Sequence, residues 1–295
     1  MISSLSTVMP MPERLLLCTD LDRTLIPNGV QPESASARRH FAQLAQQPQI
    51  TLAYVSGRHR ELVQYAIDEY QLPQPQYVIG DVGTTIYAVT GEGQWHITKA
   101  WEDSIDKDWQ HLSHDELSRT LTGIDALQLQ EPEKQNRHKL SFYVPPSVNQ
   151  EQLKSAVTAA LAAKNIIARQ VWSVDEVAGL ALLDIVPLQA GKYHAIKALQ
   201  SLQGFSDAST VFSGDSGNDM EVLVSPVPST LVANSSSLLQ QQAADTAAAA
   251  GNSNSLYIAR GDFMGMNGNY SAGILEGIAY YHPETLEWMG FEGTG

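Results

Sequence analysis

The chain has 295 residues, of which 43% are hydrophobic and 17% charged, an ordinary composition for a globular protein with a substantial core. Its 32 acidic and 18 basic residues give a net charge of −14, which argues against non-specific binding to nucleic acid or to anionic membranes. No apolar stretch approaches the ~20 residues of a membrane helix, residues 1–13 lack a signal-peptide pattern, and the single cysteine, Cys18, cannot form an intrachain disulfide, so we expect a cytoplasmic protein.

The first part of the chain alternates short apolar runs with segments of helical character. Apolar runs predict buried strands at 15–19, 50–55 and 77–79, and helices are predicted between them at 32–46 and 61–70. This alternation is typical of a doubly wound parallel sheet, in which binding sites lie at the carboxyl ends of the strands.

The middle of the chain has a different character. It contains a predicted hairpin at 90–96, a mostly helical segment at 101–117, a helix at 152–164, and strands at 139–144, 166–172 and 180–186. This mixture predicts an inserted α+β unit rather than a continuation of the parallel sheet.

The doubly wound pattern then resumes with helices at 191–202, from 220 and at 240–250, and strands at 209–212 and 229–232. The predicted fold is therefore α/β, with a doubly wound, Rossmann-like core formed by residues 14–88 and 188–295. An α+β cap is predicted at 89–187, and a loose tail at 1–13.

Polar residues follow the first two predicted strands. Asp20 and Asp22 are two residues apart, so in extended geometry their carboxylates would face the same side and could share a metal and a reacting group. Ser56 and Gly57 can offer O–H and N–H donors to a phosphate oxygen. An Asp-rich turn and a serine-capped strand-to-helix turn are the respective alternatives.

Two further groups lie in the last part of the chain. Lys192 begins a predicted helix, where the helix dipole disfavours a cation unless an anion is near, although a solvated lysine is the alternative. The loop 214–219 contributes Asp215, Asn218 and Asp219, whose oxygen atoms suit Mg²⁺. All four groups lie where a strand ends or a helix begins, so we expect them to converge on one edge of the sheet.

These four groups resemble the four motifs of the haloacid dehalogenase-like phosphatases, and the position of the predicted cap resembles the class with a large α/β (type IIB) cap. The segments 138–144, 183–192 and 214–219 are similar to the sucrose-phosphate phosphatases. The similarity extends over most of the chain and is weakest at 101–122 and after residue 281.

The resemblance implies a magnesium-dependent phosphatase with an aspartyl-phosphate intermediate. Asp20 would attack phosphorus, and Asp22 would protonate the leaving oxygen and then activate water, which requires a raised pKa for Asp22. Ser56 and the N–H of Gly57 would hold the phosphoryl oxygens, which Lys192 would neutralise. The residues expected to bind Mg²⁺ are Asp20, Asp22 through its carbonyl, and Asp215, with Asp219 close by, either as a further ligand or as a partner of the ligands. Arg23 stands where this family often has Gly or Asn. We expect its side chain to point away from the metal, and the alternative is that it reaches the substrate or the cap.

The cap is expected to select the leaving group, because the motif residues recognise only phosphate. By resemblance, Lys139 and Ser141 are candidates for sugar contacts and Asn218 is a further substrate-binding candidate, although Lys139 could equally be a strand-edge lysine. Sucrose 6-phosphate is the first choice of substrate, and mannosylfructose phosphate is the alternative. A sugar phosphomutase and a non-catalytic sugar-phosphate sensor remain further alternatives. We expect a monomer whose partner is a small-molecule sugar phosphate.

Overall fold

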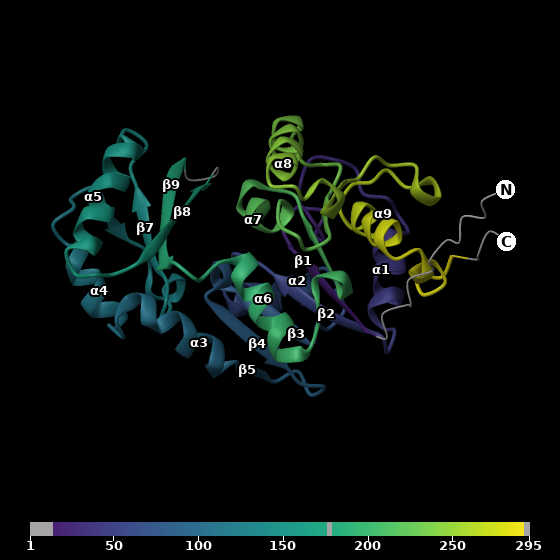
Figure 1. Ribbon diagram of the computed structural model, residues 1–295, viewed down its shortest axis with the longest axis horizontal. Helices are drawn as coiled ribbons and strands as arrows, with labels where there is room; N and C mark the ends of the chain where they lie inside the picture. The colour runs from purple at the N-terminus through teal and green to yellow at the C-terminus, as the bar shows by residue number, and fades with distance from the viewer. Residues whose placement is uncertain (1–13, 176–178, 292–295) are drawn as a thin grey trace, which may run out of the picture.

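The computed structural model describes residues 14–175 and 179–291, and it contains two sheets (Figure 1). The larger sheet has the strand order β12-β11-β10-β1-β2-β3-β4-β5, with parallel pairing from β12 to β3 and antiparallel pairing for β3-β4 and β4-β5. Its strands are β1 (Leu15–Thr19), β2 (Ile50–Val55), β3 (Tyr77–Gly80), β4 (Thr85–Val89), β5 (Trp95–Ile97), β10 (Thr210–Gly214), β11 (Ser229–Leu231) and β12 (Leu256–Ile258).

Helices cover both faces of the larger sheet. Both faces are apolar because successive strand residues point to opposite sides: Leu15 and Leu17 join one core cluster, and Leu16 and Cys18 join the other. The first cluster contains side chains of α1 (Ala37–Ala45), α2 (Arg60–Glu69) and α9 (Ser271–Tyr281). The second contains side chains of α3 (Lys99–Ile105), α6 (Lys192–Gln203), α7 (Met220–Leu223) and α8 (Ser237–Ala249).

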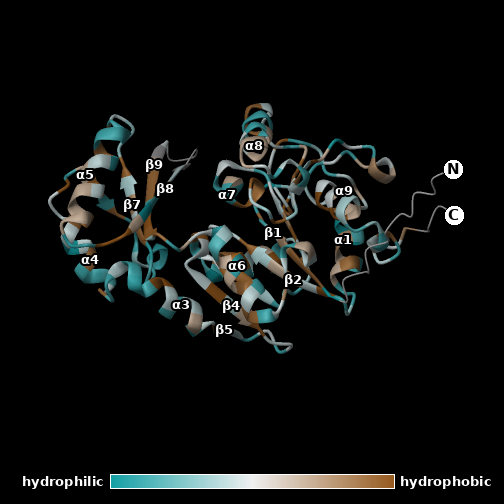
Figure 2. Ribbon diagram, in the orientation of Figure 1, coloured by the Kyte–Doolittle hydropathy of each residue, from teal (hydrophilic) through white to brown (hydrophobic). Residues whose placement is uncertain are grey.

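The smaller sheet is antiparallel, with the strand order β6-β7-β9-β8. Its strands are β6 (Gln128–Leu129), β7 (Leu140–Val144), β8 (Ala168–Asp175) and β9 (Leu180–Pro187). The helices α4 (His114–Leu121) and α5 (Gln150–Ala162) lie on the side that faces away from the larger sheet (Figure 1). Figure 2 shows the hydrophobic colouring of β9, which contributes to the core beneath these helices.

Side chains along β7 and β9 alternate between the two faces of the smaller sheet, so polar side chains lie on the face opposite α4 and α5. Leu140 and Phe142 pack in the cluster beneath α4 and α5, as do Leu183 and Ile185. Ser141 and Asp184, which lie between these residues and are paired across the two strands, therefore point to the opposite face.

The predicted doubly wound core is confirmed, and several predicted bounds differ from those in the structure. The predicted strand 15–19 is β1, and 50–55 is β2. The helix predicted at 32–46 spans only Ala37–Ala45. The strand β12 and the helix α9 were not predicted, and α9 is apolar on nearly all sides because it is packed against the sheet.

One predicted domain boundary differs from the sheet topology. The cap was predicted to begin at residue 89, but Trp95–Ile97 pairs with β4 and is the edge strand β5 of the larger sheet. The hairpin formed by β4 and β5 belongs to the core domain, because Trp95 of β5 packs against Tyr87 of β4. Both residues are in the apolar cluster that contains Val63 of α2. We propose that the inserted unit begins after β5. The tail predicted at 1–13 lies outside the described residues, and none of the described helices is long and apolar enough to cross a membrane.

Candidate active site

The carboxyl ends of neighbouring parallel strands bring three buried carboxylates together. Asp20 follows β1 and Asp215 follows β10, and these two strands are adjacent. Asp219 comes from the short turn after Asp215 and is fully buried. Asp20, Asp215 and Asp219 offer oxygen atoms that all lie within 4.8 Å of one another. The prediction that these acids share one edge of the sheet is confirmed.

Lys192 contacts two of these carboxylates. Its Nζ atom is 3.0 Å from Oδ2 of Asp20, 2.6 Å from Oδ1 of Asp219 and 3.0 Å from Oδ1 of Asn218. The side chain is only 2% exposed. Burial alone would lower the pKa of Lys192, but the charges of Asp20 and Asp219 outweigh this effect and raise it above its usual value. The neighbouring carboxylates therefore favour the charged form of Lys192.

The position of Lys192 depends on a close contact between two loops. Lys192 is the first residue of α6, and Gly191 before it has a φ of 150°. Gly83, which has a φ of 90°, packs so closely on Gly191 that a Cβ atom at Gly83 would lie 2.4 Å from the carbonyl carbon of Gly191. Only glycine fits at position 83, because any side chain would push the start of α6 away from the sheet.

The cluster has more negative than positive charge. Burial raises the pKa of Asp20, and the neighbouring Asp219 and Asp215 raise it further against the opposing effect of Lys192. Burial and the charge of Asp219 raise the pKa of Asp215 to about 6. Three buried carboxylates of this kind supply the hard oxygen ligands that suit Mg²⁺, and a divalent cation would offset their repulsion. The residues present therefore fit the ion that the sequence implied.

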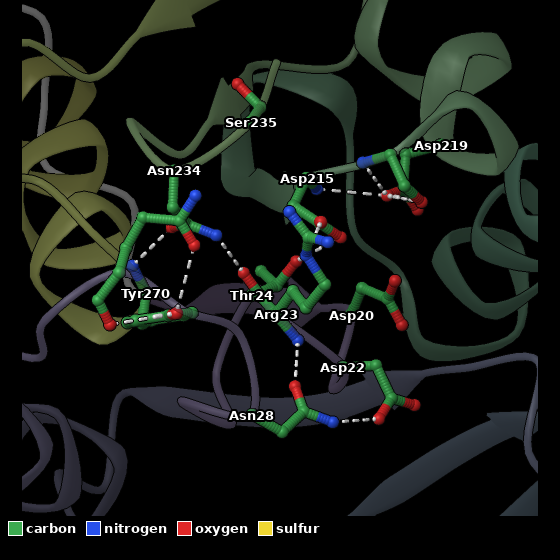
Figure 3. Close-up of polar contacts among 12 residues, drawn as sticks. Asp20, Asp22, Arg23, Thr24, Asn28, Asp215, Asp219, Asn234, Ser235 and Tyr270 are labelled. Carbon is green, nitrogen blue, oxygen red and sulfur yellow. Dashed lines mark hydrogen bonds and ion pairs between the residues drawn. The ribbon is translucent and has the colours of Figure 1, made fainter. Parts of the chain in front are cut away.

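Asp22 does not join the three carboxylates. Its Oδ2 accepts a hydrogen bond of 2.7 Å from Nε of Arg58, and its Oδ1 accepts one of 2.6 Å from Nη2 of Arg58. The same Oδ1 accepts a bond of 2.7 Å from Nδ2 of Asn28 (Figure 3). Burial acts to raise the pKa of Asp22, but the hydrogen bonds and charge of Arg58, together with Asn28, lower it below its usual value. The expectation of a raised pKa is therefore wrong for this arrangement, because sequence reasoning did not pair Asp22 with Arg58.

The second predicted motif lies beside Asp22. Ser56 is buried at the end of β2, and its Oγ accepts a hydrogen bond of 3.2 Å from the backbone N–H of Arg58. Gly57 and Arg58 line the cavity that also contains Asp20 and Asp22. Sequence reasoning gave no role to Arg58, which directly follows Gly57, because its partner Asp22 lies 36 positions away in the chain.

Arg23 points towards the acidic cluster, contrary to expectation. Its Nε lies 3.3 Å from Oδ2 of Asp215 (Figure 3). Its φ of 56° is in the left-handed region, which Gly and Asn adopt more readily than Arg does. The backbone N–H of Arg23 donates to Oδ1 of Asn28, and its carbonyl accepts from Nδ2 of Asn234. Sequence reasoning missed Asn28 and Asn234, because no motif spacing reveals that their side chains bind the backbone of Arg23.

A cavity of ≈ 430 Å³ lies between the cluster and the smaller sheet. Asp20, Asp22, Asp215 and Asn218 line its core side, and the residues that line its cap side include Gln130, Lys134, Lys139, Ser141, Trp172 and Asp184. Gly57, one of the predicted phosphate-binding residues, therefore lines the same cavity as the predicted substrate-binding residues Lys139, Ser141 and Asn218.

The cap-side residues are held by buried polar contacts. Lys139 is 5% exposed, and its Nζ lies 2.9 Å from Oδ1 of Asp81, a residue of the core. The hydroxyl of Ser141 donates a hydrogen bond of 2.6 Å to Oδ1 of Asp184. Burial raises the pKa of Asp184, and Lys139 opposes this effect. Lys139 is therefore a buried partner in a contact between cap and core rather than a solvated strand-edge lysine.

A family model described as Sucrose-6F-phosphate phosphohydrolase matches residues 13–282 of the chain. The chain belongs to this family. Family membership confirms the resemblance inferred from the four motifs, and it confirms the predicted enzyme class, a phosphatase of the haloacid dehalogenase-like type.

Individual relatives agree with the family match. A protein of Nitrosococcus oceani whose name places it among the HAD-like hydrolases is 51% identical over 95% of this chain and 75% of its own length. The Mannosylfructose-phosphate phosphatase of Agrobacterium fabrum is 29% identical over 69% of this chain and 76% of its own length. The chain spans about half the length of the plant sucrose-phosphatases that it matches.

The fold also has a close counterpart among solved structures. The Sucrose-Phosphatase from Synechocystis sp. PCC6803, solved in complex with sucrose and phosphate, has a TM-score of 0.70 and 25% sequence identity. The similarity covers 92% of this chain and 98% of that one. This phosphohydrolase family member therefore has the predicted architecture, a doubly wound core with a cap.

Proposed function

We propose that the protein hydrolyses a disaccharide phosphate in a Mg²⁺-dependent reaction through an aspartyl-phosphate at Asp20. The observation that carries this proposal is the cluster of Asp20, Asp215 and Asp219, in which Lys192 contacts Asp20 and Asp219. Asp20 and Asp215 line a cavity that is also lined by residues of the smaller sheet. Three buried carboxylates with one lysine stabilise a fold no better than apolar side chains of similar size would, so their presence here favours a catalytic role.

The nucleophilic step uses Asp20 and Lys192. An oxygen of Asp20 forms a bond to phosphorus while the bond between phosphorus and the sugar oxygen breaks. Lys192 lies within hydrogen-bond distance of Asp20 and can neutralise the phosphoryl oxygens as charge builds on them. Ser56 and Gly57, at the end of β2, would hold the same oxygens.

Proton transfer is assigned to Asp22. A protonated Asp22 gives its proton to the departing sugar oxygen, and the resulting carboxylate then takes a proton from the water that attacks the aspartyl-phosphate. Phosphate leaves and Asp20 is regenerated. Because Arg58 stabilises the charged form of Asp22, the contact between them must loosen before the first proton transfer.

Asp20, Asp215 and Asp219 would hold Mg²⁺, together with the carbonyl of Asp22. When bound, the cation supplies positive charge that neutralises the phosphate and aligns it with the nucleophile. The chain's own net charge of −14 makes this supply necessary for an anionic substrate.

The leaving group is assigned to a disaccharide, with sucrose 6-phosphate as the first choice. The family description and the sucrose complex of the Synechocystis protein support sucrose 6-phosphate, and the Agrobacterium relative supports mannosylfructose phosphate as the alternative. Lys139 and Ser141 would contact the sugar from the cap, and Asn218 would contact the substrate from the core. Polar groups of this kind discriminate well, because a sugar that leaves them unpaired costs ~1–3 kcal/mol for each group.

The test is a panel of phosphate esters incubated with the protein and Mg²⁺, followed by measurement of inorganic phosphate. The panel contains sucrose 6-phosphate, mannosylfructose phosphate, glucose 6-phosphate and p-nitrophenyl phosphate. We expect phosphate release from one disaccharide phosphate, its loss on chelation, and no turnover by Asp20→Asn. An isomeric sugar phosphate without phosphate release would indicate a phosphomutase, and binding without any reaction would indicate a sensor.

A further inference from the structure

Arg23 is held in a fixed backbone conformation by two asparagines. Its N–H donates a hydrogen bond of 2.8 Å to Oδ1 of Asn28, and its carbonyl accepts one of 2.7 Å from Nδ2 of Asn234 (Figure 3). Asn28 also donates to Asp22, and Oδ1 of the buried Asn234 accepts from the backbone N–H of Tyr270. The backbone N–H and the carbonyl of Arg23 are therefore both held by side chains of residues around the site.

The conformation that results is one that an arginine rarely adopts. The φ of Arg23 is 56°. Glycine and asparagine adopt this left-handed region readily, whereas other residues are strained in it. An arginine in this position therefore strains the backbone, and contacts of its side chain would have to offset the conformational free energy of that strain.

The side chain of Arg23 reaches the acidic cluster. Its Nε lies 3.3 Å from Oδ2 of Asp215, while Thr24 Oγ1 donates to Oδ1 of the same carboxylate at 3.3 Å. The Asp215 side chain is 5% exposed and that of Arg23 is 46% exposed. The buried carboxylate thus has a partner on each oxygen, and the partner on Oδ2 is a cation with access to solvent.

We propose that Arg23 is the resident counter-ion of Asp215, that a divalent cation must displace it, and that it therefore weakens the affinity of the site for that cation. This inference rests on the proposed function, which makes Asp215 a metal ligand. An oxygen paired with a guanidinium is not fully available to a second cation, and two positive charges a few ångströms apart repel each other. Arg23 can leave because its half-exposed side chain regains water when the ion pair breaks.

The cavities on either side of Arg23 give the displaced side chain somewhere to go. Arg23 lines the cavity that contains Asp20 and Asp22, and it also lines a second hollow beside α8, where Ser236 and Leu238 form the wall. The guanidinium can therefore swing away from Asp215 without repacking the core.

The experiment measures Mg²⁺ binding to the metal-free full chain by isothermal titration calorimetry, without substrate. We expect Arg23→Asn, which suits the left-handed backbone, to bind Mg²⁺ about three- to tenfold more tightly than the unaltered protein. Arg23→Lys, which keeps the charge, should stay closer to the unaltered protein. Arg38→Asn is the matched control, because Arg38 forms its ion pair with Glu33 and the substitution removes the same charge away from the cluster.

A second measurement guards against a folding defect. The rise in the thermal unfolding midpoint caused by Mg²⁺ should be larger for Arg23→Asn than for the unaltered protein, and Arg23→Gly should behave as Arg23→Asn does. Unchanged or weaker Mg²⁺ binding by both variants, with binding by the unaltered protein intact, would overturn the counter-ion role alone. If the unaltered protein does not bind Mg²⁺, the proposed metal site and the counter-ion role both fail.

Discussion

The guanidinium of Arg58 donates two hydrogen bonds to the carboxylate of Asp22, one of 2.7 Å from Nε and one of 2.6 Å from Nη2. A bidentate contact of this kind fixes the orientation of the carboxylate and favours its charged form. The two residues come from the loops after β1 and β2, which are neighbouring parallel strands. The proposed proton donor is thus positioned by the loop that also carries the proposed phosphate-binding residues.

The proton-transfer role of Asp22 predicts a dependence on the leaving group. Asp22→Asn should slow release of the sugar from a disaccharide phosphate by roughly 10²–10⁴, because the sugar oxygen needs a proton. Release of p-nitrophenol should fall much less, because that group departs without one. Single-turnover measurements of both alcohols test this, with Asp20→Asn as the control that stops both. An equal loss for the two leaving groups would contradict the assignment.

Lys192 predicts a large effect on stability. Lys192→Met would leave Asp20 and Asp219 buried without their cation, so we expect the free energy of unfolding without Mg²⁺ to fall by about 3–5 kcal/mol. Lys197→Met is the matched control on the same helix, because Lys197 pairs with Asp207 at the surface and should matter by less than about 1 kcal/mol. Urea denaturation of both variants checks this, and similar values for the two would be incompatible with a buried counter-ion role for Lys192.

The pair formed by Lys139 and Asp81 separates stability from substrate selection. Lys139→Gln alone should destabilise the protein, because the buried Asp81 carboxylate loses its partner. Adding Asp81→Asn should restore much of that stability but not the preference for a disaccharide phosphate over p-nitrophenyl phosphate. Thermal unfolding and the ratio of kcat/KM for the two substrates are the readouts. If the double variant recovers the preference as well, Lys139 does not contact the sugar.

The contacts of Asp106 predict that its carboxylate stabilises the folded cap to an extent that depends on pH. Burial acts to raise the pKa of Asp106, but hydrogen bonds from His138 and His111 and the charge of Arg137 outweigh it and lower the pKa to about 2. A lowered folded-state pKa contributes stability that is present above the usual aspartate pKa of ~3.9 and is lost as pH falls towards 2. Asp106→Asn should therefore cost about 1–3 kcal/mol at pH 7.

The effect of Asp106→Asn should itself depend on pH, and this dependence is the control for the substitution. The difference in unfolding free energy between Asp106→Asn and the unaltered protein should narrow as the pH falls from about 4 to about 2, because the carboxyl group of Asp106 becomes increasingly protonated over this range. Urea unfolding at several pH values measures this difference. A constant difference across that range would show that the carboxylate charge is not what stabilises the cluster.

The sequence predicted the parts of the site whose positions follow from strand ends. Asp20 and Asp215 could be placed together because parallel strands bring their carboxyl ends to one edge. The apolar run of Leu15–Thr19 was sufficient to locate β1, because a strand buried on both faces has a continuous hydrophobic sequence.

What could not be predicted depends on contacts between residues far apart in the chain. Arg58 pairs with Asp22 across 36 positions, and this pairing reverses the expected direction of the Asp22 pKa shift. The direction of the Arg23 side chain depends on a left-handed backbone held by Asn234, 211 positions away. Strand β5 was assigned to the cap because its three residues carry too little pattern to show that they pair with β4.

The central claim is that Asp20 carries the phosphoryl group between the substrate and water. The direct test is an acid quench of the Mg²⁺-loaded enzyme during turnover of its disaccharide phosphate, followed by mass spectrometry of the peptide that contains Asp20. We expect one phosphoryl group on Asp20, absent when Mg²⁺ is chelated and absent in Asp20→Asn. Steady release of phosphate from the substrate without a phosphorylated Asp20, or with the phosphoryl group on another residue, would contradict this account.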